Sequence, residues 1–145
     1  MATGLEALGA ASACLQLISF AANIIQTCKK VYEGRPTSSD HLGEHVRRMM
    51  GAVDRVQSRC KTMAEMQPTN YDKKLDDIAG SCSAAARELE DEVRYLTQLQ
   101  EKSSLLKSIN ATLRASRHRK KLELLELSLS RNRQVMEVEL FSHLW

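Results

Sequence analysis

The longest uncharged stretch of this chain, residues 7–28, constrains its fold more than any other feature. Charged residues make up 27% of the whole sequence, yet this stretch contains none. Its polar residues recur at intervals of four and three, which places them on one face of a helix. This polar stripe consists of Ser12, Gln16, Ser19, Asn23 and Gln26. The spacing therefore predicts a long N-terminal helix that is apolar on every side but one.

Two environments suit such a helix. A central helix of a soluble bundle also lacks charge, and this is the simpler interpretation. The stretch would rise about 33 Å as a helix, close to the roughly 30 Å hydrocarbon thickness of a bilayer. A single spanning helix would expose Gln16, Asn23 and Gln26 to lipid, whereas several copies could turn these side chains inward. A secretory signal peptide is disfavoured, because Glu6 and no Lys or Arg precedes the stretch.

The rest of the sequence predicts an all-α fold, a helical bundle of four to five helices. Almost no segment alternates as a strand does, and both prolines, Pro36 and Pro68, fall between periodic stretches. We expect one domain over residues 1–145. We also expect the last two helices of this domain to be separated by a break near Ser116 to His118. The expected helices span about 3–32, 40–66, 71–101, 104–116 and 119–144.

Apolar residues at helical spacing mark the faces that we expect to pack. On the second helix these are Leu42, Val46, Met49, Val53, Val56, Cys60 and Met63. On the third they are Leu75, Ile78, Cys82, Ala85, Leu89, Val93 and Leu96, with the acids Glu88, Glu90, Asp91 and Glu92 expected toward water. The C-terminal stripe is Leu122, Leu125, Leu129, Met136 and Leu140. The cysteines Cys14, Cys28, Cys60 and Cys82 form no CxxC pair and lie among apolar positions, which predicts reduced core thiols in a cytosolic protein.

Residues 102–121 contain seven basic residues and no acid, although the net charge of the whole chain is only +3. One interpretation is pairing with the acidic third helix, and another is contact with anionic lipid headgroups. Nucleic acid is disfavoured as a partner, because the segment has no aromatic residues on which bases could stack. The candidate lipid contacts are Lys29, Lys30, Lys107, Arg114, Arg117, Arg119, Lys120 and Lys121.

One motif resembles a catalytic site. His41, Glu44 and His45 form the pattern H-x-x-E-H, in which two histidines bind zinc and the glutamate acts as a base. A zinc hydrolase also needs a third ligand, for which the sequence suggests only Glu123 or Glu126, and a substrate cleft for which a small bundle has little room. We therefore expect no metal, no cofactor and no catalytic residue, and the zinc hydrolase remains a remote alternative.

Through residues 4–12 and 15–20 near its start, and residues 105–114, 122–126 and 131–134 toward its end, the sequence resembles the fungal SesA domain and its HeLo-like relatives. The two N-terminal segments read GLEALGAAS and LQLISF. The middle of the chain matches only in its helical pattern.

The resemblance implies a non-enzymatic N-terminal effector of a fungal NOD-like receptor, placed before a nucleotide-binding module of the NACHT or a related class. HeLo-type relatives are helical bundles implicated in heterokaryon incompatibility and programmed cell death. Their first helix is thought to enter the plasma membrane after oligomerisation. By this analogy the domain is cytoplasmic until activation, and its partners are anionic phospholipid, further copies of itself and the downstream module. The implied membrane-inserting residues are Leu5, Leu8, Leu15, Leu17, Ile18, Phe20, Ile24 and Ile25.

A different class of function remains open, a helical adaptor that recruits other proteins while its first helix stays buried. The burial of that helix is the observation that bears on the choice. A first helix that is loosely covered favours release, whereas one encircled by the others favours the adaptor. The Met start and an end inside a periodic stretch favour a piece of a longer protein.

Overall fold

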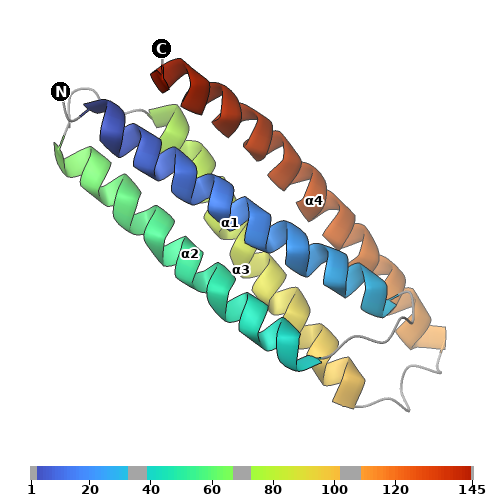
Figure 1. The fold of residues 1–145 in the computed structure, drawn as a ribbon. Helices are drawn as coiled ribbons and strands as arrows, with labels where there is room; N and C mark the ends of the chain where they lie inside the picture. The colour runs from blue at the N-terminus through green and yellow to red at the C-terminus, as the bar shows by residue number, and fades with distance from the viewer. Residues whose placement is uncertain (1–2, 33–38, 67–72, 102–108, 145) are drawn as a thin grey trace.

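A computed structural model describes four helices, and the described part of the chain contains no strand (Figure 1). The all-α class is confirmed. Side chains are described for residues 6–32, 41–65, 73–98 and 116–141. The helices are α1 (Thr3–Tyr32), α2 (Ser39–Met66), α3 (Lys73–Glu101) and α4 (Ile109–Leu144).

The C-terminal region forms one helix, so the expected break near Ser116 to His118 is wrong. α4 continues through these residues as regular helix. No glycine or proline occurs between Ile109 and Leu144, and the residues that separate the two apolar patterns are mostly Arg and Lys, which favour helix. The change in charge along the sequence therefore marks an exposed side of one helix and not a turn. The expected helix start at 104 lies outside the described residues.

The helices run alternately up and down, so that the start of α1 and the end of α4 lie at the same end of the bundle (Figure 1). α1 contacts each of the other three helices, whereas α2 and α4 are not neighbours and lie on opposite sides of α1 and α3. α1 is therefore the central helix on one side of the bundle. Small residues such as Ala10, Ala11 and Ala21, all fully buried, let the neighbouring backbones approach it.

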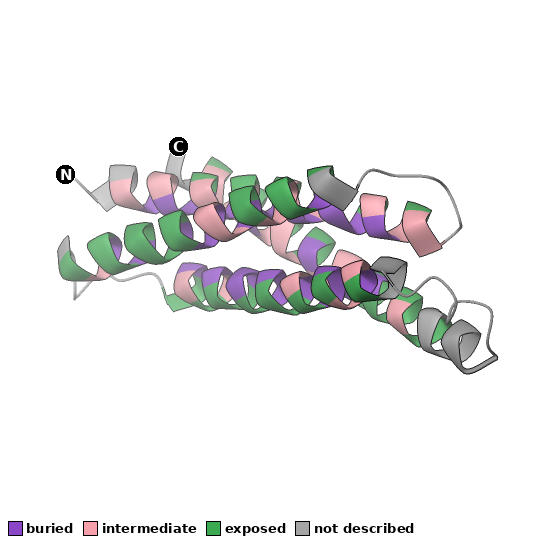
Figure 2. Ribbon diagram, turned by 90° about the horizontal axis from the view of Figure 1, so that it is seen from below, coloured by how far each residue is buried: buried purple, intermediate pink, exposed green. Residues whose placement is uncertain are grey.

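The predicted packing faces form the core. Buried positions lie on the sides of the helices that face one another (Figure 2). Every residue of the predicted stripes on α2, α3 and α4 is buried except Val46, Ile78 and Leu140, which are half-buried against the core. The four cysteines are buried and free, as predicted.

Candidate functional site

Within the described residues, α1 is the one helix long and apolar enough to cross a membrane. The qualifying part runs from Glu6 to Tyr32, and half of its most apolar window is buried. This criterion concerns length and composition alone, and the core helix of a soluble protein also meets it. The packing around α1 is therefore more informative than its hydropathy.

The polar stripe of α1 lies on its one uncovered side. Ser12, Gln16, Ser19, Asn23 and Gln26 are all exposed. α2 and α4 flank α1 in Figure 1, and α3 lies behind it. The prediction of a helix apolar on every side but one is confirmed, because three helices cover the apolar sides and solvent meets the fourth.

The implied membrane-inserting residues are mostly hidden. Leu17, Ile18, Ile24 and Ile25 are buried in the core. Leu8, Leu15 and Phe20 are half-buried, and the side chain of Leu5 lies outside the described part. Each fully buried aliphatic side chain contributes roughly 1.5–3 kcal/mol. α1 would have to leave the bundle before these side chains met lipid.

Polar contacts join α1 to α4 beside the polar stripe. Lys29 Nζ lies 3.0 Å from Glu126 Oε1, and Gln26 Nε2 donates to Glu126 Oε2 at 2.7 Å. Further along, Arg133 Nη2 donates to Ser19 Oγ at 3.3 Å. These groups are partly exposed, so an ion pair such as Lys29 with Glu126 contributes only about 0–1 kcal/mol. The contacts orient α4 on α1 but hold it weakly.

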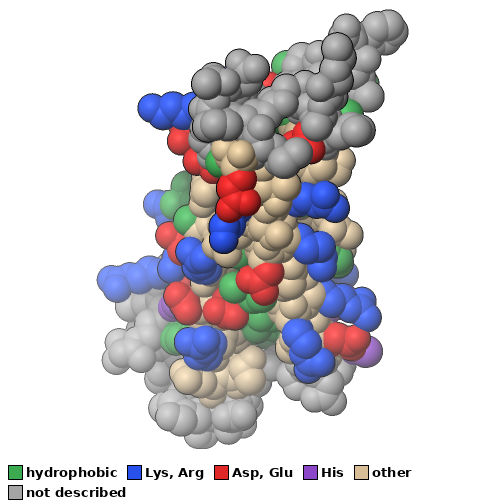
Figure 3. All heavy atoms as spheres, turned by 90° about the vertical axis from the view of Figure 1, so that its left-hand side faces the viewer, with side chains coloured by type: hydrophobic (Ala, Val, Ile, Leu, Met, Phe, Trp, Pro, Cys, Tyr) green, Lys and Arg blue, Asp and Glu red, His purple; other side chains and the backbone are tan. Residues whose placement is uncertain are grey.

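The basic residues divide into paired and free groups at the end of the bundle where α1 ends and α4 begins. Lys29 pairs with Glu126, and Lys121 Nζ lies 3.1 Å from Glu92 Oε1. The side chains of Lys107 and Arg114 lie outside the described part. The basic residues that are exposed and form no ion pair with another described residue are Lys30, Arg117, Arg119 and Lys120. On the face shown in Figure 3, basic and acidic side chains are interspersed.

Glu92 does not face water, so that expectation is wrong. Its side chain is buried, because α4 packs against this side of α3. Both carboxylate oxygens have partners on α4, His118 Nδ1 and Lys121 Nζ. The ring of His118 also stacks on Tyr95, with centroids 3.8 Å apart. A cluster of the buried Glu92 carboxylate, the half-buried His118 and the exposed Lys121 thus joins α3 to α4.

The end of α1 reaches this cluster through Tyr32. The hydroxyls of Tyr32 and Tyr95 are buried without a hydrogen-bond partner among the described residues. Burial, and secondarily the charge of Glu92, raises the pKa of Tyr32 well above its ordinary value. The Tyr32 hydroxyl therefore stays protonated as a neutral group beside the ion-pair cluster.

Four apolar residues on the outer side of α4 were not foreseen. Leu124, Leu127, Val138 and Phe141 are 60%, 49%, 64% and 61% exposed. The predicted apolar stripe of this helix, from Leu122 to Leu140, is the one that faces the core. The signal was present, because these four residues, with Arg131 and Gln134 between them, fall at intervals of three and four.

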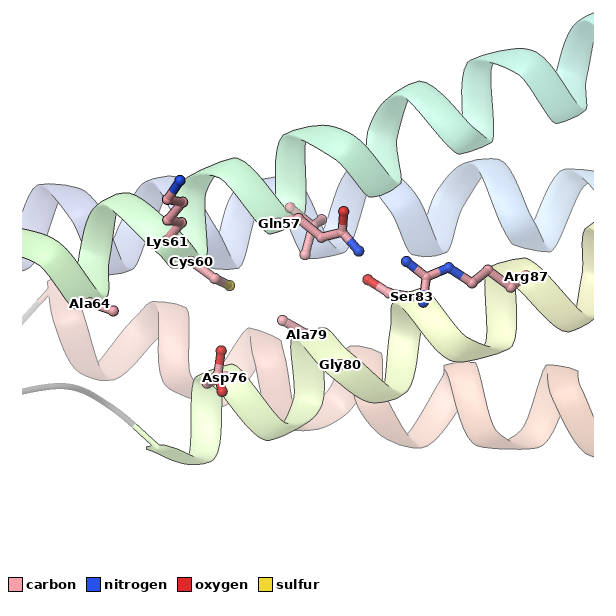
Figure 4. A pocket seen from close by; sticks show the side chains of 10 residues that line it. Gln57, Cys60, Lys61, Ala64, Asp76, Ala79, Gly80, Ser83 and Arg87 are labelled. Carbon is pink, nitrogen blue, oxygen red and sulfur yellow. The ribbon is translucent and has the colours of Figure 1, made fainter.

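A groove of about 340 Å³ lies between α2 and α3 (Figure 4). Its polar side chains are dispersed, with Asp76 and Arg87 toward opposite ends in Figure 4. Cys60 lines the groove, and burial, with a smaller effect of Asp76, raises the pKa of its thiol to about 11. A nucleophilic cysteine needs a lowered pKa, so this thiol is unsuited to catalysis.

The H-x-x-E-H motif does not form a metal centre with the suggested third ligands. His41 and Glu44 are exposed, and Glu44 accepts a hydrogen bond from Arg48 Nη2 at 2.8 Å. Glu123 and Glu126 belong to α4, which is not a neighbour of α2. Over the described ranges, no three His, Cys, Asp or Glu side chains are grouped so as to hold a metal ion.

Comparison with known proteins identifies a family for this chain. Neither the curated proteins nor the solved structures compared with the chain include a significant match. The family model of SesA, described as an N-terminal domain on NACHT NTPases and P-loop NTPases, matches residues 11–136. This segment covers α1 from Ala11 to its end, all of α2 and α3, and most of α4. The chain therefore belongs to the SesA family.

Proposed function

We propose that this SesA domain is a non-catalytic cell-death effector at the N-terminus of a fungal NOD-like receptor, and that oligomerisation drives α1 into the plasma membrane. The family occurs N-terminal to NACHT NTPases, which supports a downstream nucleotide-binding module as its partner. The observation that carries the proposal is the composition of α1, which is long enough to span a bilayer and polar along a single stripe.

The proposed mechanism has a closed and an open state. In the closed state α1 buries its apolar sides against three helices, and the domain stays in the cytoplasm. Clustering by the downstream module raises the local concentration of released α1 helices. Several inserted helices then turn the polar stripe toward one another, so that Gln16 and Asn23 hydrogen-bond between helices and avoid lipid.

The exposed basic residues support docking on an anionic membrane surface. Lys30, Arg117, Arg119 and Lys120 carry no ion pair with any other described residue, and they lie at one end of the bundle. Each such residue near an anionic surface contributes about 1 kcal/mol. They orient the C-terminal end of α1 toward the headgroups.

The decisive variant must leave the closed bundle intact. Leu17→Glu is unsuited, because Leu17 is fully buried and a buried charge would unfold the domain. Gln16→Arg is suited, because Gln16 is exposed on the polar stripe and lies near the middle of the apolar segment. In a bilayer, a central Arg costs about 2.5–3.5 kcal/mol on insertion scales. Gln57→Arg makes the same change at an exposed site of α2 and serves as the control.

The experiment is dye release from anionic and neutral liposomes by the domain fused to a trimeric tag. We expect release by the wild type and by Gln57→Arg, strongest from anionic liposomes, and little release by Gln16→Arg. Equal release by Gln16→Arg would show that α1 does not insert with Gln16 packed between neighbouring helices, as the mechanism requires. A folded trimer that neither binds nor permeabilises liposomes would favour the adaptor, a function that the packing of α1 against three helices also supports.

A further inference from the structure

The outer side of α4 carries an apolar stripe that nothing in the described part of the chain covers. Its apolar members are Leu124, Leu127, Val138 and Phe141, each about half exposed or more. The side chains of α4 that pack into the core, such as Leu125, Leu129 and Met136, lie on the opposite side of the helix. Contiguous exposed apolar side chains of this kind mark interaction surfaces.

The stripe has the repeat of a helix-pairing seam. Its positions follow one another at intervals of three and four, which is the spacing of a coiled-coil seam. Polar residues occupy its centre, and apolar residues occupy both ends. The full order is Leu124, Leu127, Arg131, Gln134, Val138 and Phe141.

This order reads the same in both directions, apolar, apolar, polar, polar, apolar, apolar. A surface with that symmetry fits a second copy of itself when the two helices run antiparallel about a two-fold axis. The axis is level with the middle of the stripe, between residues 132 and 133. The facing pairs are then Leu124 with Phe141, Leu127 with Val138, and Arg131 with Gln134.

Charge favours this orientation over the parallel one. In a parallel pair Arg131 would face Arg131 of the other copy, and two like charges would meet in the seam. In the antiparallel pair Arg131 faces Gln134, and the levels of Arg131 and Glu137 of the other copy each lie three residues, about 4.5 Å of axial rise, away. In the parallel pair the like charge would be level with Arg131, and Glu137 would be six residues, about 9 Å, away. Arg131 and Glu137 are exposed, and neither forms an ion pair with another described residue. Each is free to pair across the seam.

We propose that the outer side of α4 is a self-association surface, on which a second copy of this chain docks through an antiparallel, two-fold α4–α4 seam. The inference does not depend on insertion of α1, because α1 stays packed on the inner side of α4. The resulting dimer leaves the polar stripe of α1 open to solvent.

The first test is sedimentation velocity over a concentration series. We expect a reversible dimer for the wild type and for Ser58→Glu, an exposed site on α2 that serves as the control. Leu124→Glu is expected to weaken association about tenfold or more, because it places a charge in the apolar end of the seam. Arg131→Glu should also weaken it by opposing Glu137, and the double variant Arg131→Glu with Glu137→Arg should restore it.

The second test is the register of the seam. Leu127→Cys and Val138→Cys are prepared separately, mixed and oxidised, while the native thiols stay buried. We expect a cross-linked heterodimer from the mixture and little cross-linking of Leu127→Cys alone, since its two copies would lie about 16 Å apart along the axis. Efficient cross-linking of Leu127→Cys alone would indicate a parallel pair and overturn the proposal.

Two further results would also overturn it. One is a wild type that stays monomeric throughout the series, or a dimer that Leu124→Glu leaves unchanged. The other is a monomer that binds anionic vesicles and loses this binding in Leu124→Glu, because the stripe would then be a membrane surface. Dye release by the tagged trimer is a separate measurement, so failure of either proposal leaves the other standing.

Discussion

α1 and α4 distribute apolar side chains in opposite ways. α1 is the most apolar helix of the bundle, yet its exposed side carries the polar residues of the stripe from Ser12 to Gln26. α4 is far more charged, yet its exposed side carries Leu124, Leu127, Val138 and Phe141. Hydropathy of a helix therefore does not tell which of its residues meet solvent. Three helices cover α1, whereas α4 contacts only α1 and α3.

The largest expected effect tests this comparison with one substitution at two sites. Leu17→Ala on α1 removes a side chain with no exposed surface, and we expect a loss of about 2–5 kcal/mol in the free energy of unfolding. Leu127→Ala on α4 makes the same change at a half-exposed site, with an expected loss below about 0.5 kcal/mol in the monomer. Urea denaturation followed by circular dichroism measures both. Comparable losses in dilute monomer would mean that the outer side of α4 is covered.

A smaller effect tests whether the polar contacts of α4 matter as much as its apolar ones. Glu92→Gln leaves the size of the side chain unchanged but removes the charge that faces His118 and Lys121. We expect a loss of about 1–3 kcal/mol, because the charge is lost and the amide NH2 group takes the place of one of the two oxygens that face His118 and Lys121. Glu88→Gln, the same change at an exposed site on α3, should fall within about 0.5 kcal/mol of the wild type. If the two variants lose equal stability, Glu92 does not join α3 to α4 as described.

A pH-dependent effect concerns the thiols, which α1, α2 and α3 bury and α4 lacks. Burial raises the pKa of Cys28 to about 12 and that of Cys82 to about 11, the latter partly offset by a hydrogen bond from Asn132. The folded protein keeps these protons at a pH where unfolded thiols ionise. The free energy of unfolding should therefore fall as pH rises from about 9 to about 11. Denaturation of the wild type and Cys82→Ala across this range measures the slope, which should be shallower in the variant.

Thiol labelling at neutral pH checks the same burial directly. We expect the native cysteines to react with a thiol reagent only as fast as the bundle opens, whereas the thiol of Leu127→Cys reacts at once in dilute monomer. Rapid labelling of Cys14 or Cys28 would show that α1 leaves the bundle without a trigger. In that case α1, which contacts three helices, would be more mobile than α4, which contacts two.

The spacing of apolar residues was sufficient to predict features that belong to a single helix. The bounds of α1, the polar stripe and the packing faces of α2 and α3 follow from the spacing of apolar residues, which is a property of a single helix. The predicted break near Ser116 is wrong, because the change in charge there is not accompanied by a glycine or proline that would end a helix. The outer apolar stripe of α4 was not predicted, although its residues have the same spacing as the inner stripe.

The sequence by itself determined which residues form helices and which side of most helices is apolar, because hydrogen bonds within a helix and its periodicity involve neighbours three and four residues apart. Only the tertiary structure decided that α1 contacts all three other helices, that Glu92 is buried against His118 and Lys121, and that no other described residue covers the outer stripe of α4. These outcomes depend on contacts between residues far apart in the chain. The spacing within one helix carries no information about which helix will lie against it.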